Sequence, residues 1–184
     1  MGILGDSLDK ATAGTATRPI PKSAGAQMRF LVKQYKRTQA VAELLGISQR
    51  TVERYVKDQF KKPHAELAAR LADQVGIRWQ PRVKEKAKKQ AATSTGIVVE
   101  TRARFGFTAA PASTDDGRIR LITQHLPPQY AARLFDAQAA GATDQQLQAV
   151  IAEGLQEQYF KDHGRRAEGL VVEFTDIDYV ELDY

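Results

Sequence analysis

The side chains best suited to recognise another molecule lie between residues 38 and 62. Gly46 stands between two helical segments, at a turn where a left-handed backbone is least strained without a Cβ. Ala42, four residues earlier, is the small side chain that two closely crossing helices need. This spacing predicts a helix-turn-helix, whose second helix enters the major groove of DNA by its N-terminal end. The candidate DNA-binding residues are Ser48, Gln49, Arg50, Thr51, Arg54, Lys57, Lys61 and Lys62.

These residues divide by the chemistry of their side chains. Gln49 and Arg50 are the candidates for base edges, because glutamine pairs well with adenine and arginine with guanine. Arg54 and the three lysines are expected to bind phosphates. Such contacts set the orientation and affinity of the complex but do not distinguish one base sequence from another. The alternative interpretation is a plain helical hairpin whose charges are only solvated.

Catalytic chemistry of the chain's own is not indicated by the sequence. Without cysteine there is no thiolate site, and the three histidines are too far apart in sequence to suggest a zinc site. We find no glycine-rich phosphate loop and no nucleophile elbow. The acidic residues between Glu173 and Asp183 alternate with apolar ones, as on a solvated strand face. We therefore expect no enzyme activity, no metal site and no intrinsic cofactor.

Charge is distributed unevenly over the two halves of the chain. Residues 1–92 have 19 Lys or Arg against 8 Asp or Glu, a net of +11, whereas residues 93–184 have a net of −6. A basic half of this kind is typical of nucleic-acid binding. No apolar run approaches the roughly 18 residues of a membrane helix, and the first residues lack the pattern of a secretory signal. We expect a cytoplasmic protein with no membrane partner.

The elements that position these residues follow from hydrophobic periodicity. We expect an α+β fold, an all-α N-terminal domain followed by a small antiparallel sheet with two covering helices in the order β-β-α-α-β. The predicted divisions are a flexible arm at 1–22, a helix-turn-helix domain at 23–80, a basic linker at 81–96 and an α+β domain at 97–184. The DNA-recognition helix is expected from Gln49 to about Phe60. Whether the basic stretch at 82–89 extends the DNA footprint or is only solvated stays open.

Segments spread over the whole chain carry a family resemblance. They are DSLDKATAGTATRPIPK at 6–22, QRTVERYV at 49–56, WQPR at 79–82, TRARFGFTAA at 101–110 and LPPQYAARLFDA at 126–137, with the acidic C-terminal segment. Together they strongly resemble the Tpg family, the terminal proteins of linear Streptomyces chromosomes and plasmids. The resemblance implies a protein that becomes covalently attached to the 5′ ends of linear DNA, caps telomeres and primes end-patching synthesis.

The resemblance also implies partners and a priming residue. The implied partners are telomeric DNA, a telomere-associated protein that binds the overhang, and a DNA polymerase, so the protein would be nucleoid-associated at replicon ends. The family's priming threonine falls on Thr114 of this sequence. The polymerase would supply the deoxynucleotide and the divalent metal. From the residues alone, Ser113, Thr108 and six tyrosines are other hydroxyls, and Asp115 and Asp116 either orient the hydroxyl or form a turn.

Two other functions are compatible with the same residues. The first is a transcriptional regulator, in which the helix-turn-helix reads an operator and the second half dimerises or senses a ligand. The second is a module that binds a protein partner along its final strand. A regulator would bind DNA reversibly, whereas a terminal protein would form a bond that survives denaturation.

Overall fold

A computed structural model describes residues 2–108, 118–165 and 169–184. The chain forms two compact units, Ala16–Pro81 and a second one made of Met1–Thr15 with Arg82–Tyr184. We call them the helical unit and the sheet unit. The predicted α+β class is confirmed, with an antiparallel sheet after the helical region. No helix in the described residues is long and apolar enough to cross a membrane.

The helical unit consists of α2 (Ala24–Tyr35), α3 (Thr38–Leu45), α4 (Gln49–Val56) and α5 (Ala65–Arg78). Ser23 caps the start of α2, because its hydroxyl accepts a hydrogen bond from the amide of Ala26. Apolar residues at helical spacing form one core in which the following are fully buried: Met28, Leu31, Val41, Leu45, Val52, Leu71 and Val75.

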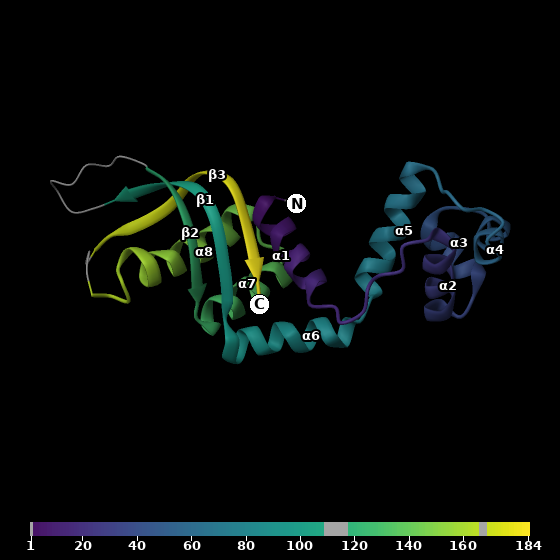
Figure 1. Cartoon of the computed structure of the whole chain (residues 1–184), viewed down its shortest axis with the longest axis horizontal. Helices are drawn as coiled ribbons and strands as arrows, with labels where there is room; N and C mark the ends of the chain where they lie inside the picture. The colour runs from purple at the N-terminus through teal and green to yellow at the C-terminus, as the bar shows by residue number, and fades with distance from the viewer. Residues whose placement is uncertain (1, 109–117, 166–168) are drawn as a thin grey trace. The chain divides into compact units, whose positions relative to one another are not determined.

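The sheet unit is built around its first strand. β1 (Ile97–Thr108) lies between β2 (Arg118–Leu126) and β3 (Val171–Asp183), and both neighbours run antiparallel to it (Figure 1). Because side chains alternate along a strand, every second residue of β1 from Ile97 to Phe105 is buried. The side chains on the other face of β1 point away from this core. They include Val98 and charged residues such as Arg102.

Helices cover the buried face of this sheet. α7 (Pro128–Ala139) and α8 (Asp144–Leu155) follow β2, as the sequence predicts, and α8 continues as a π-helical turn at Gln156–Phe160. In Figure 1 they lie behind the sheet, and α1 (Ile3–Gly14) lies alongside β3. Residues of all three helices share one apolar core with the strands.

Helix α1 corrects the expectation of a flexible arm at residues 1–22. Leu4 and Leu8 are each only 1% exposed, within the core of the sheet unit. The amides of Leu4 and Gly5 donate hydrogen bonds of 3.0 and 2.9 Å to Oδ1 of Asp144. This carboxylate satisfies the unpaired amides at the start of the helix and opposes the positive end of its dipole. Within the described part of the predicted arm, residue 2 and residues 15–22 lie outside helix and strand.

The predicted linker at 81–96 is also ordered as helix. α6 (Pro81–Gln90) continues into a π-helical turn at Ala91–Thr95, and Ala91 is fully buried. The helical unit ends at Pro81, one residue after the predicted end of the helix-turn-helix domain, and residues 82–96 of the predicted linker belong to the sheet unit. The left-handed Gly96 allows a sharp entry into β1, since a Cβ there would lie 2.2 Å from the carbonyl oxygen of Leu126.

Burial of α1 makes its leucines a test of this arrangement. We expect Leu8→Ala to lower the free energy of unfolding of the sheet unit by about 2–5 kcal/mol, because it leaves a cavity in the core. Urea unfolding followed by far-ultraviolet circular dichroism measures this change. Ile3→Ala, at a position 37% exposed on the same helix, is the matched control. Equal effects of the two substitutions would show that α1 does not belong to the core.

Candidate nucleic-acid interface

A tight turn of Gly46, Ile47 and Ser48 joins α3 to α4. Gly46 has φ +64°, and the amide of Ile47 donates a 3.0 Å hydrogen bond back to the carbonyl oxygen of Ala42. Ser48 then caps α4, because its Oγ accepts from the amide of Thr51 at 3.2 Å. The turn thus has the left-handed glycine and the hydroxyl cap that the sequence predicts.

The inner faces of α3 and α4 are held together by a small apolar wedge. Val41, Leu45 and Val52 are fully buried, and Tyr55 is 5% exposed. Ala42 is 4% exposed within the same cluster, where a larger side chain would meet its neighbours. Packing of these residues leaves the N-terminal end of α4 at the surface.

The two residues predicted to read bases both lie at this exposed end, but they differ in their contacts. Gln49 donates hydrogen bonds through Nε2 to Thr38 Oγ1 at 3.0 Å and to Glu53 Oε1 at 3.1 Å. These bonds fix the orientation of its amide. Arg50 is exposed, and no hydrogen bond or ion pair to its side chain occurs in the part of the chain that the structure describes. Arg50 is therefore the predicted base-reading residue that is ready to bind another molecule.

Thr51 and Arg54 are half-buried and already have contacts within the unit. Thr51 Oγ1 lies 2.8 Å from Ser48 Oγ, so both hydroxyls serve the start of the helix. The guanidinium of Arg54 lies 5.2 Å from the ring centroid of Phe60, which itself packs edge-on against Tyr55. Cation–π stacking holds Arg54 in place while leaving its donors available to phosphate. The sequence alone does not reveal that Phe60 stacks against Arg54, because this contact depends on the chain turning back after α4.

Helix α4 ends at Val56, four residues earlier than the predicted end at Phe60. Arg29 of α2 donates through Nη1 to the carbonyl oxygen of Val56 at 2.9 Å and pairs with Asp58 at 2.7 Å. Asp58 adopts a left-handed backbone, φ +55°, which ends the helix. Lys57, Lys61 and Lys62 are exposed on the turn and the extended segment that follow.

Electrostatically, the helical unit favours a polyanion. Residues 16–81 have 13 Lys or Arg against 5 Asp or Glu, a net of +8. A unit of this charge attracts phosphates over several ångströms and raises the rate of encounter with DNA.

The predicted priming residue Thr114 lies outside the described residues, as do Ser113, Asp115 and Asp116. The described residues stop at Thr108, where β1 ends, and resume at Arg118, where its antiparallel neighbour β2 begins.

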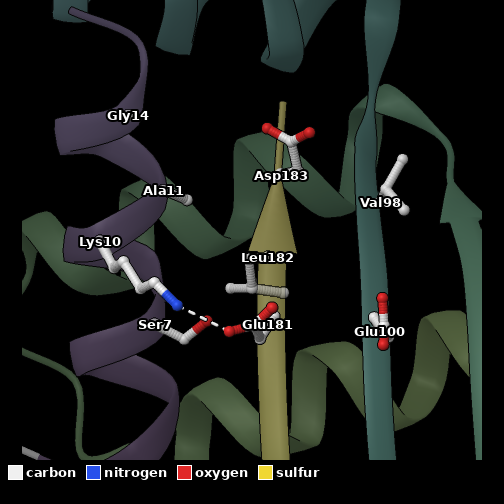
Figure 2. A pocket seen from close by; sticks show the side chains of 9 residues that line it. All are labelled: Ser7, Lys10, Ala11, Gly14, Val98, Glu100, Glu181, Leu182 and Asp183. Carbon is white, nitrogen blue, oxygen red and sulfur yellow. Dashed lines mark hydrogen bonds and ion pairs between the residues drawn. The ribbon is translucent and has the colours of Figure 1, made fainter.

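A groove of about 430 Å³ lies beside β3, between this strand and α1 (Figure 2). Lys10 of α1 reaches across it to Glu181, with Nζ and Oε1 2.6 Å apart. Glu100 and Asp183 also line it, so three acids and one lysine line the groove. This balance disfavours a nucleotide or another anion, and no group of side chains suited to a metal ion occurs among the described residues.

The exposed end of α4 can be tested in the full-length chain. Arg50→Ala should weaken binding to duplexes enriched by the wild type from a random pool, by about 1–3 kcal/mol if Arg50 makes a bidentate base contact. It should also relax the sequence preference at one position. Fluorescence anisotropy on the enriched duplexes and their single-base variants measures both effects.

The matched control is Arg18→Ala, which removes the same charge from an exposed side chain. The hydrogen bonds to Trp79 and Gln80 use the backbone at position 18, so the substitution retains them. If both substitutions reduce affinity equally and leave the preference unchanged, α4 does not read bases.

Comparison with protein-family models, curated proteins and solved structures gives no match for this chain. The resemblance of its sequence segments and the geometry and charge of its own residues are therefore the features that bear on its function.

Proposed function

We propose that this chain is a terminal protein, which becomes covalently attached to the 5′ end of linear DNA through the hydroxyl of Thr114 and primes DNA synthesis there. The observation that carries the proposal is the family resemblance in segments from residue 6 to the acidic C-terminal segment, which include the one leading into Thr114. Two features of the structure support it. A basic helical unit exposes the end of α4, and β1 and β2, which flank residues 109–117 in the sequence, belong to a separate unit.

The proposed chemistry requires a reachable hydroxyl and little else from this chain. Thr114 Oγ attacks the α-phosphate of a deoxynucleoside triphosphate, a phosphoester bond forms, and pyrophosphate leaves. The hydroxyl proton passes to a base or water in the polymerase site, where metal ions held by the polymerase stabilise the phosphoryl transition state. The 3′-hydroxyl of the attached nucleotide then serves for extension. The chain is consumed as an acceptor and is not an enzyme.

The helical unit would position the protein on telomeric DNA before this reaction. Arg50 and Gln49 would contact bases, and Arg54 with the following lysines would contact phosphates. The overhang-binding protein and the polymerase remain the proposed partners, and the deoxynucleotide and metal arrive with the polymerase. Residence at chromosome or plasmid ends follows from the covalent bond.

A transcriptional regulator is the second candidate function. The observation in its favour is the same exposed end of α4, since an operator would be read by the same residues. A regulator differs from a terminal protein in requiring no covalent bond to DNA. Its complexes would dissociate in salt, whereas the product of the priming reaction would survive detergent and strong denaturant.

The priming reaction distinguishes these functions directly. Purified protein would be incubated with labelled deoxynucleotide, cell extract and telomeric single strand, and the label retained after denaturation would be measured. We expect label on the wild type and on Ser113→Ala, less label on Thr114→Ser, and none on Thr114→Ala. Of these variants, only Thr114→Ala lacks a hydroxyl at position 114.

A known terminal protein labelled in the same extract is the positive control. Absence of label on the wild type under those conditions would refute the proposal and favour the regulator. Label on Thr114→Ala would move the attachment point to another hydroxyl.

A further inference from the structure

Helix α6 is a basic element on an otherwise acidic unit. Residues 82–90 have five Lys or Arg and one Glu, a net of +4. The rest of the sheet unit has 9 basic against 16 acidic residues, a net of −7. The proposed function assigns no role to this concentration of positive charge.

One side of α6 faces the body of the sheet unit. Lys88 Nζ lies 5.2 Å from the ring centroid of Phe135 on α7 and 3.3 Å from Gln138 Oε1. Burial, and then the neighbouring charge of Lys88, lower the pKa of Lys84, although Asp9 of α1 opposes the shift. Val83 and Ala87 are half-buried on the same side. These contacts fix the rotation of α6 about its axis.

The opposite side of α6 carries three exposed cations, Arg82, Lys86 and Lys89. Their i, i+4, i+7 spacing places them in one row about 10 Å long. No ion pair involves any of the three in the described part of the chain, and Glu85, which is also exposed, pairs with none of them. The row is therefore not neutralised by the protein.

Helix stability does not account for this row. Like charges at i, i+4 destabilise an isolated helix by a few tenths of a kcal/mol, and Arg82 with Lys86 are such a pair. A compensating polyanion would remove the repulsion and release its own counterions on binding. Nucleic acid is the polyanion favoured here, because α5 of the basic helical unit ends at Arg78, three residues before α6 begins.

We infer that the row formed by Arg82, Lys86 and Lys89 is a second nucleic-acid contact, which binds backbone phosphates without reading bases. This deepens the proposed function and depends on it only in taking DNA as the ligand of the chain. The sheet unit is then held on DNA by α6 while the helical unit supplies sequence preference.

The test compares two double variants of the full-length chain. Lys86→Gln with Lys89→Gln removes two charges from the row. Arg118→Gln with Arg165→Gln removes two charges from exposed side chains outside α6, at the start of β2 and shortly before β3. Binding to a random 30-base-pair duplex, a length chosen at roughly three helical turns, would be measured by fluorescence anisotropy over a salt series.

We expect the α6 variant to reduce the slope of log affinity against log salt by about 2 and to bind about tenfold more weakly near 0.1 M salt. The control variant should retain the wild-type slope, and Lys86→Arg with Lys89→Arg should restore it. Circular dichroism and the urea midpoint should match the wild type, because both lysines are exposed.

Equal slopes for the α6 variant and the wild type would overturn the inference, and so would equal losses in the two double variants. The outcome is separable from that of the proposed function, because this assay contains no polymerase or nucleotide. A reduced slope without covalent label would support the α6 contact and refute priming. Covalent label with an unchanged slope would support priming and refute the α6 contact.

Discussion

Strand β1 is the constraint on which the sheet unit depends. It is the only described strand with a neighbour on each side, so neither β2 nor β3 has a place in the sheet without it. Because β3 is the last element, its pairing with β1 brings the end of the chain back beside the beginning. There Thr12 Oγ1 and Tyr184 Oη lie 2.6 Å apart, and Lys10 pairs with Glu181. Closure of this unit therefore needs nearly the whole chain outside residues 16–81.

The same strand separates α6 from the far end of the sheet. Its 12 residues extend over about 40 Å. At one end β1 follows α6 and the π-helical turn at Ala91–Thr95, and at the other end Thr108 pairs with Val171, the first residue of β3. The row of cations on α6 and the start of β3 therefore lie at opposite ends of β1.

Much of this fold could be predicted from sequence, because its signals are local. Ser48, Gly46 and the apolar spacing define α3 and α4, and alternation defines β1. The failures have long-range causes. α1 has only two buried leucines in a segment rich in small residues, and Asp144, which caps it, lies about 140 residues away. The end of α4 depends on Arg29 of another helix, and Thr114 could be selected only through the family resemblance.

The acidity of the sheet unit limits where DNA can approach it. Glu100, Glu181 and Asp183 line the groove beside β3, and each would repel a phosphate placed there. Arg102 on the uncovered side of β1 is paired with Asp178 at 2.9 Å, which weakens its attraction for a second anion. In the proposed complex, phosphates would thereby be directed away from the groove and toward the row on α6. Repulsion by the sheet and attraction by α6 would act together, so DNA would bind this unit in a defined orientation with little base contact.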